Sequence, residues 1–189
     1  MVPIFDPDAE RKKRVKGMNE PKYYEAKPNG LIGEVKLNDL YQEVILDHNR
    51  RPRHFTEVED ANAYAHGHNP LCGDDYFLYL LVDQGGIIKK VGFKGEGCAI
   101  SKSSASMMTV AVEGKGVKEA GAAKDNFIHL LTDDTASDAV RAAAGKLKIF
   151  EGVKQFPVRV KCATLIWRTL EEALKDRSQR KEEVSTEKE

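Results

Sequence analysis

The sequence feature that most constrains the fold is a pair of apolar segments on either side of a short turn. Residues 76–82 are aromatic and aliphatic throughout, and residues 87–94 alternate between apolar and polar side chains. The turn between them, residues 83–86, ends in two glycines that let the chain reverse direction within a few residues. This pattern predicts an antiparallel β-hairpin, and the glycines of residues 95–97 are expected to break its second strand.

Most of the remaining chain has the apolar spacing of helices. A first helical face starts at Leu37, with Asn38 as the expected N-cap, and stops before Pro52. Further helices are expected over residues 100–113, 117–123, 127–131 and 137–150, and after Pro157 from about residue 162 to 176. Residues 61–65 are a candidate edge strand. The fold class predicted is therefore α+β, a small antiparallel sheet of about three strands packed against five or six helices.

Composition and charge exclude several classes of function. Thirty basic and 30 acidic residues give a formal charge of zero, so no global field attracts nucleic acid or an anionic membrane. The longest apolar run is about seven residues, far short of the ~20 that cross a bilayer. The N-terminus becomes charged at once, without the apolar segment of a secretory signal. We therefore expect a cytoplasmic protein with no nucleic-acid or membrane partner.

The distribution of prolines and charges suggests three regions. Residues 1–36 hold four of the seven prolines and lack apolar periodicity, which predicts a flexible N-terminal extension. Residues 37–176 contain the predicted elements and are long enough for one domain. Residues 177–189 are expected to be a charged C-terminal tail.

Three cysteines carry the candidate chemistry: Cys72, Cys98 and Cys162. An odd number does not make a closed disulfide framework, and thiols stay reduced in the cytosol, although each could simply be a small buried residue. Cys72 and Asp74 precede the first hairpin strand and Cys98 follows the second, so antiparallel pairing should bring these three together. Cys98 and Cys162 are expected at helix N-termini, where unpaired N–H groups favour the thiolate.

Three thiolates and one carboxylate would supply the four donors of a tetrahedral zinc site, and cysteine ligation also suits iron-sulfur chemistry. Spacing alone leaves the choice open, because the chain has no Cys-x-x-Cys pair. Arg159 and Lys161 stand just before Cys162, where cations would stabilise thiolates and persulfides. His66 and His68 precede Cys72, but hydrogen bonding or a partner contact is the preferred interpretation, since four stronger donors already fill a tetrahedron.

Three motifs in a fixed order point to a family. They are Cys72-Gly73-Asp74, then residues 95–101 with a Ser/Ala-rich continuation to residue 108, and residues 156–167 around Cys162. Together with the first helix, they resemble the NifU/IscU-like family of iron-sulfur cluster assembly proteins, and most closely its SufU branch. The resemblance covers about residues 37–175, and residues 1–36 lie outside the family pattern.

The resemblance implies a SufE/NifU-like fold and a role for each motif residue. Cys72, Asp74, Cys98 and Cys162 match the family positions that bind zinc or hold a cluster. In the SufU branch, the cysteine matched by Cys72 accepts sulfur from a cysteine desulfurase.

Two features favour the SufU branch over the IscU type. This chain has Lys161 where IscU-type members have histidine directly before the last cysteine, and its stretch between Cys98 and Cys162 is longer. The implied function is a zinc-dependent sulfurtransferase with a SufS-like cysteine desulfurase as partner and other iron-sulfur assembly proteins as further candidates. The alternative is a scaffold that assembles and transfers a [2Fe-2S] or [4Fe-4S] cluster on the same ligands.

Overall fold

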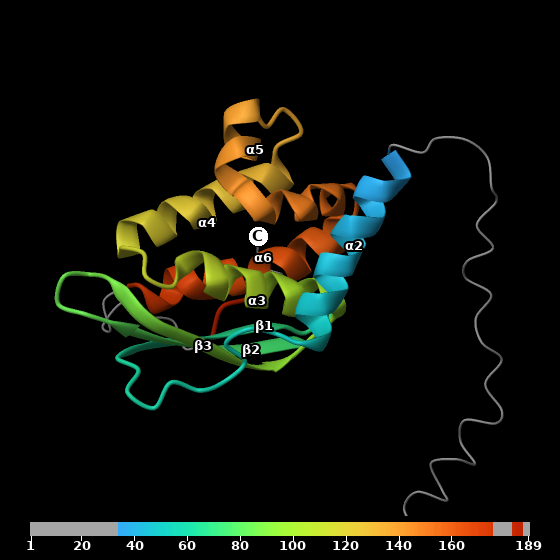
Figure 1. Cartoon of the computed structure of the whole chain (residues 1–189). Coiled ribbons are helices and arrows are strands. Elements are labelled where there is room, and N and C mark those ends of the chain that lie inside the picture. Colours follow the sequence, from blue (N-terminus) through green and yellow to red (C-terminus); the bar gives the residue numbers. More distant parts are fainter. Residues whose placement is uncertain (1–33, 176–182, 187–189) are drawn as a thin grey trace, which may run out of the picture. The chain divides into compact units, whose positions relative to one another are not determined.

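The computed structural model describes residues 34–175 and 183–186 (Figure 1). The chain divides into the units Met1–Glu34 and Val35–Glu189, of which the second is described below. Nearly all of the N-terminal extension and most of the C-terminal tail predicted from sequence lie outside the described residues. Within those residues, no helix has both the length and the apolar character needed to cross a membrane.

A three-stranded antiparallel sheet, in the order β1-β2-β3, forms one layer of the fold. Its strands are β1 (Ala63–Asn69), β2 (Asp74–Val82) and β3 (Ile88–Glu96). Burial alternates along β1 and β2, so one face of the sheet meets the helices and the other faces solvent. The predicted hairpin is confirmed by the pairing of β2 with β3.

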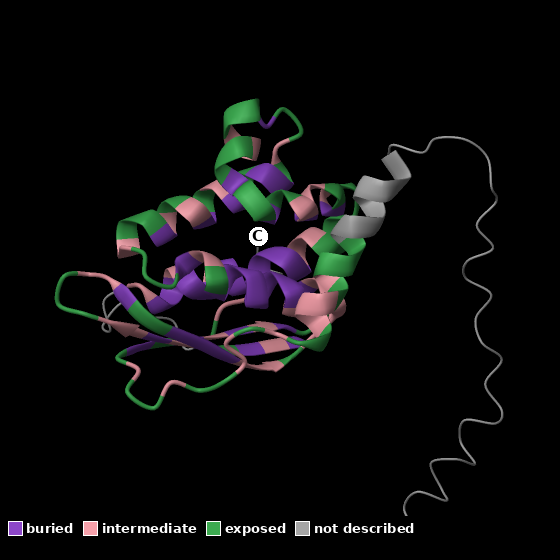
Figure 2. Cartoon of the chain, in the orientation of Figure 1, coloured by how far each residue is buried: buried purple, intermediate pink, exposed green. Residues whose placement is uncertain are grey.

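Helices cover one face of this sheet. They are α2 (Glu34–Arg50), α3 (Ala99–Val112), α4 (Val117–Thr132), α5 (Asp138–Ala144), the 3₁₀ segment η2 (Gly145–Gln155) and α6 (Pro157–Ala173). Helices α3 and α6 pack together, α3 against β3 and α6 against β1 and β2, while α4 and η2 pack on α6 from the far side. Figure 2 shows buried residues concentrated where α3 and α6 face the sheet. The predicted α+β class, with three strands and five α-helices among the described residues, is confirmed.

A buried polar connection ties α3 to α6. The hydroxyl of Ser104 donates to the carbonyl of Ala163 at 2.6 Å, and the indole N–H of Trp167 donates to the same hydroxyl oxygen at 3.2 Å. Trp167 also stacks on Phe127 of α4, with ring centroids 4.8 Å apart. Buried polar groups need hydrogen-bond partners, and these groups find them on the neighbouring helix. The contacts therefore fix the packing of α3, which begins after Cys98, against α6, which contains Cys162.

Two predicted boundaries that affect the site are wrong. Helix α6 begins at Pro157 rather than near Cys162, because proline fits the first helical turn, where its missing N–H costs nothing. Strand β3 continues through Gly95 to Glu96, since Gly95 adopts a φ of +133° that other residues rarely adopt and lies directly against the Asp75 carbonyl. The predicted boundary therefore places Cys162 at the start of the helix, whereas Cys162 lies in its second turn.

Other predicted boundaries also differ from those in the structure, with less effect on the site. Helix α2 starts at Glu34, so Asn38 is an interior residue rather than the N-cap. The segments 117–123 and 127–131 form one continuous helix, α4. Strand β1 extends four residues beyond the predicted edge strand 61–65, because pairing with β2 overrides the weak strand propensity of its glycine and histidines.

Gly67, in the middle of β1, provides a test of how closely the sheet meets α6. A Cβ at this position would overlap the hydroxyl of Thr169, which is buried and donates to the Leu165 carbonyl at 2.8 Å. We expect Gly67→Ala to lower the free energy of unfolding by about 1–3 kcal/mol through overpacking, measured by chemical denaturation.

The matched control is Gly121→Ala. Gly121 lies inside α4, and an added methyl group there meets open space. This change should raise stability by about 0.5–1 kcal/mol, because alanine favours a helix interior. Equal effects of the two substitutions would contradict the close contact at Gly67.

Candidate metal centre

Cys72 lies in the tight turn that joins β1 to β2. The carbonyl of Asn69 accepts the N–H groups of Cys72 and Gly73 at 3.2 and 2.9 Å, and its side-chain Oδ1 accepts those of Leu71 and Cys72 at 3.1 and 3.4 Å. Gly73 follows with a φ of +69°. Cys72 is half-buried beside Leu71, which is 78% exposed. The turn therefore presents the Cys72 thiol at the rim of the site.

Asp74, the first residue of β2, points its carboxylate inward. Its Oδ1 accepts the backbone N–H of Cys98 at 2.8 Å, whereas Oδ2 is buried without a hydrogen-bond partner among the described residues. Gly97 leaves space for this group, because a Cβ there would lie 2.6 Å from Oδ1. A buried carboxylate oxygen without a donor is costly, so Oδ2 fits the position of a ligand to a cation.

Cys98 is the N-cap of α3, as the sequence predicts. Its sulfur accepts the backbone N–H of Ser101 at 3.4 Å. A hydrogen bond from Cys162, together with that N–H, lowers the pKa of the Cys98 thiol to about 6 against the opposing effect of burial. The Cys98 thiol is therefore more readily deprotonated than an ordinary cysteine.

Cys162 lies in the second turn of α6 and is fully buried. Its hydrogen bond with Cys98 raises the pKa of its thiol most, and burial and the neighbouring Cys72 and Asp74 raise it further. The Cys162 proton is thus held by the hydrogen bond to the Cys98 sulfur. A bound cation would take the place of that proton, because metal ligation requires deprotonated thiols.

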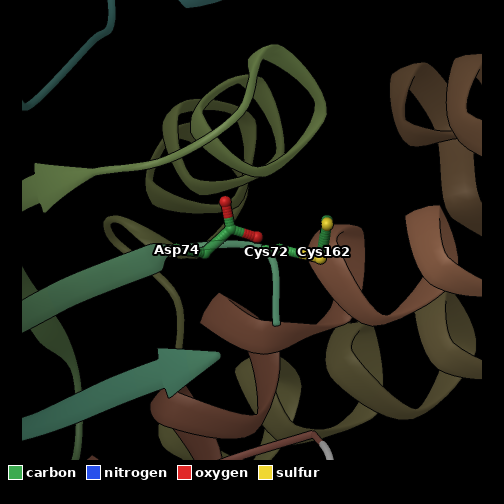
Figure 3. A group of neighbouring side chains, drawn as sticks. All are labelled: Cys72, Asp74 and Cys162. Carbon is green, nitrogen blue, oxygen red and sulfur yellow. The ribbon is translucent and has the colours of Figure 1, made fainter. Parts of the chain in front are cut away.

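The structure brings three of the four donors suggested by the sequence, Cys72, Asp74 and Cys162, to one place. Ligand atoms of Cys72, Asp74 and Cys162 lie within 4.8 Å of one another, and Figure 3 shows the Asp74 carboxylate beside the two sulfurs. Cys98 lies outside that group of three but contacts it through the thiol of Cys162. Since Zn–S bonds are about 2.3 Å, ligand sulfurs on one zinc ion lie about 4 Å apart. Three sulfurs and one carboxylate fit zinc or an iron-sulfur cluster better than magnesium or calcium.

The two cationic side chains suggested by the sequence, Arg159 and Lys161, belong to α6 itself and have different surroundings. Arg159 is exposed and lines, with Ile100 and Phe156, a cavity of about 1050 Å³ between α2, η2 and α6. Lys161 is half-buried directly before Cys162. The main influences on the pKa values of Cys98 and Cys162 are the other thiols, burial, Asp74 and helix N–H groups rather than either cation.

His66 and His68 are on the open face of the sheet. The Nε2 atom of His66 lies 3.0 Å from Asp75, and its ring stacks on Phe77 with centroids 4.3 Å apart. This placement agrees with the expectation that these histidines form hydrogen bonds rather than join Cys72, Asp74 and Cys162 as metal ligands.

Sequence reasoning missed Asn69 and Gly97 as parts of the site. Asn69 holds the turn through its side chain, and Gly97 leaves room for Asp74. The Asn-Pro pair at residues 69–70 is the local signal that marks such a turn.

Comparison with known proteins places this chain in a family. The model of the NifU-like N terminal domain matches residues 40–184. The chain is 39% identical over 140 residues to the iron-sulfur cluster assembly scaffold protein IscU of Streptococcus pyogenes serotype M1, covering 74% of this chain and 86% of that protein. It is 38% identical over 140 residues to the zinc-dependent sulfurtransferase SufU of Bacillus subtilis, covering 74% of this chain and 92% of that protein.

A solved structure agrees with these matches. The crystal structure of a putative iron-sulfur cluster assembly scaffold protein for the SUF system from Fervidobacterium islandicum superposes with a TM-score of 0.66 at 36% identity, covering 73% of this chain and 98% of that one. The residues matched by the family model, 40–184, include all three strands and helices α3 to α6. The chain belongs to the family of the NifU-like N-terminal domain.

Proposed function

We propose that this protein acts in iron-sulfur cluster biogenesis as a zinc-dependent sulfurtransferase, which accepts sulfur on Cys72 from a SufS-like cysteine desulfurase. The observation that carries the proposal is the unequal placement of three thiols around one donor cluster. Cys72 is on a turn at the rim, Cys98 caps a helix, and Cys162 is fully buried inside another. The similarity to a relative named as a zinc-dependent sulfurtransferase supports the same reading.

The sulfur transfer itself is an exchange between sulfur atoms. The Cys72 thiolate attacks the outer sulfur of a cysteine persulfide on the desulfurase. A new S–S bond forms at Cys72 while the S–S bond of the donor breaks, and the donor cysteine leaves as a thiolate. No external oxidant or reductant is needed. Cys162 has no exposed surface and is poorly placed for this attack.

The donor cluster would hold the metal through Cys72, Asp74, Cys98 and Cys162. Bound zinc supplies positive charge that keeps the thiols deprotonated near neutral pH. Asp74 is the one oxygen donor in this set, and its attachment to a soft ion is weaker than that of a thiolate. We infer that Asp74 keeps the site labile enough for Cys72 to react.

Replacing Asp74 by a thiol donor tests this role. Asp74→Cys should release zinc to a competing chelator about tenfold more slowly, because a thiolate replaces the weaker ligand. The release is measured from the absorbance of a metallochromic chelator. Asp83→Cys, in the hairpin turn, controls for the additional thiol and should release zinc at the rate of the unmodified protein. Unchanged release from Asp74→Cys would show that the carboxylate does not control lability.

The second candidate function is a scaffold for an iron-sulfur cluster. The match to a protein named as the IscU scaffold favours it, and the same sulfurs suit iron. Purification without oxygen separates the candidates. About one zinc per chain without iron or acid-labile sulfide supports sulfur transfer, whereas iron with stoichiometric sulfide supports the scaffold.

A further inference from the structure

Residues 183–186 lie along the outer edge of β1, far in sequence from the strand they meet (Figure 1). Val184 forms a parallel bridge with Gly67. The N–H of His68 donates to the Val184 carbonyl at 2.8 Å, and the N–H of Val184 donates to the His66 carbonyl at 2.9 Å. An uncovered edge strand exposes unpaired backbone groups, so this segment covers part of that edge.

Side chains fasten the same segment to β1. Thr186 is only 2% exposed, and its hydroxyl oxygen accepts a hydrogen bond from Asn69 Nδ2 at 3.2 Å. Glu183 places one carboxylate oxygen 3.8 Å from His66 Nδ1 and 3.6 Å from His68 Nδ1. The segment is thus held by backbone, hydroxyl and charged contacts.

The Asn69 amide connects this segment to the turn that carries Cys72. Its Nδ2 donates to Thr186, while its Oδ1 accepts from the N–H groups of Leu71 and Cys72. Asn69 has no exposed surface, so its amide has no water as an alternative partner. The same buried amide thus contacts both Thr186 and the turn that carries Cys72.

We propose that residues 183–186 form a strap that positions Cys72, with Asn69 as the positioning residue between them. The strap keeps the turn in the conformation that holds Cys72 near Asp74 and Cys162. Its importance for sulfur acceptance rests on the proposed function, but its control of the turn does not. A segment that only covered the edge of β1 would stabilise β1 without this specific effect on residues 71–73.

Two substitutions at Thr186 separate these cases in the full-length protein. Thr186→Val keeps the shape but removes the hydroxyl, and Thr186→Ser keeps the hydroxyl. Amide hydrogen exchange, read by mass spectrometry of peptides covering residues 70–75, reports the order of the turn. We expect exchange there to be about fivefold faster in Thr186→Val, the factor that corresponds to one lost hydrogen bond, and close to the unmodified rate in Thr186→Ser.

Peptides from the β2–β3 turn, residues 83–87, provide the internal reference and should not change. Unchanged exchange at residues 70–75 in Thr186→Val would overturn the proposal, as would an equal rise over residues 70–75 and 83–87. Persulfide formation on Cys72 is then measured in the same variants and should fall in Thr186→Val alone. If the unmodified protein takes no sulfur on Cys72, the proposed function fails while the exchange result still decides the strap.

Discussion

Cys72→Ala is expected to take up no sulfur from a SufS-like cysteine desulfurase, although it remains folded. Cys72 is half-buried on a turn, and its truncation removes few packing contacts. If it is the acceptor, the variant loses the nucleophile itself, so transfer should fall below detection rather than by a modest factor. The protein is incubated with desulfurase and cysteine, persulfides are trapped by alkylation, and the added sulfur is located by peptide mass.

Cys98→Ser is the comparison for this experiment. Like Cys72→Ala, it removes one of the three thiols, but it leaves Cys72 in place. The added persulfide sulfur should therefore remain on the Cys72 peptide at a reduced level. Circular dichroism of both variants checks that they are folded. Persulfide found only on Cys98 or Cys162, or full stimulation of the desulfurase by Cys72→Ala, would refute the assignment and favour the cluster scaffold.

The sheet and the main helices follow from local sequence. The apolar runs on either side of residues 83–86 specify a hairpin because strand periodicity and turn glycines agree. Cys98 is correctly placed at a helix start, since the glycines of residues 95–97 interrupt the strand pattern and helical apolar spacing begins at Ile100. Where several local signals agree, the sequence predicts the structure well.

The remaining features depend on contacts between distant parts of the chain. Nothing local in His66-Gly67-His68 favours a strand, and the segment becomes one by pairing with β2. The strap pairs Val184 with Gly67 across more than a hundred residues, a contact that neither segment's own pattern indicates. Tertiary pairing, rather than local propensity, decides these elements.

The sequence indicates candidate donors for the site but not their surroundings. Chain order and hairpin geometry suggest that Cys72, Asp74 and Cys98 converge, and the family resemblance adds Cys162, whereas the structure groups Cys72, Asp74 and Cys162. The helix start at Pro157 places Cys162 inside α6, so the hydrogen bond with Cys98 and burial raise the pKa of its thiol, whereas a helix N-terminus would lower it. The orphaned Oδ2 of Asp74 is likewise visible only in three dimensions.

Cys162→Ser is expected to abolish the stabilisation of the fold by zinc. Cys162 contacts each of the other three donors, so its loss removes the centre of the cluster. A ligand that binds only the folded state stabilises it by about 2.7 kcal/mol at a free concentration of 100 times its Kd. For a chain of this size that corresponds to a rise in Tm of about 5–10 °C. The unmodified protein should show this rise when zinc is added to the metal-free form, and Cys162→Ser should show almost none.

The comparison of Tm with and without zinc within each variant separates metal binding from packing. Serine in a buried position lowers the Tm of both forms, but only lost coordination removes the difference between them. His129→Ala is the matched control, because His129 lies in the last turn of α4, where its ring contacts Asp133, and the change should leave the zinc-dependent rise intact. A full rise in Cys162→Ser, or its loss in His129→Ala, would show that zinc does not bind at Cys162. Equal Tm values for metal-free and zinc-loaded unmodified protein would mean that the cluster does not couple metal binding to folding.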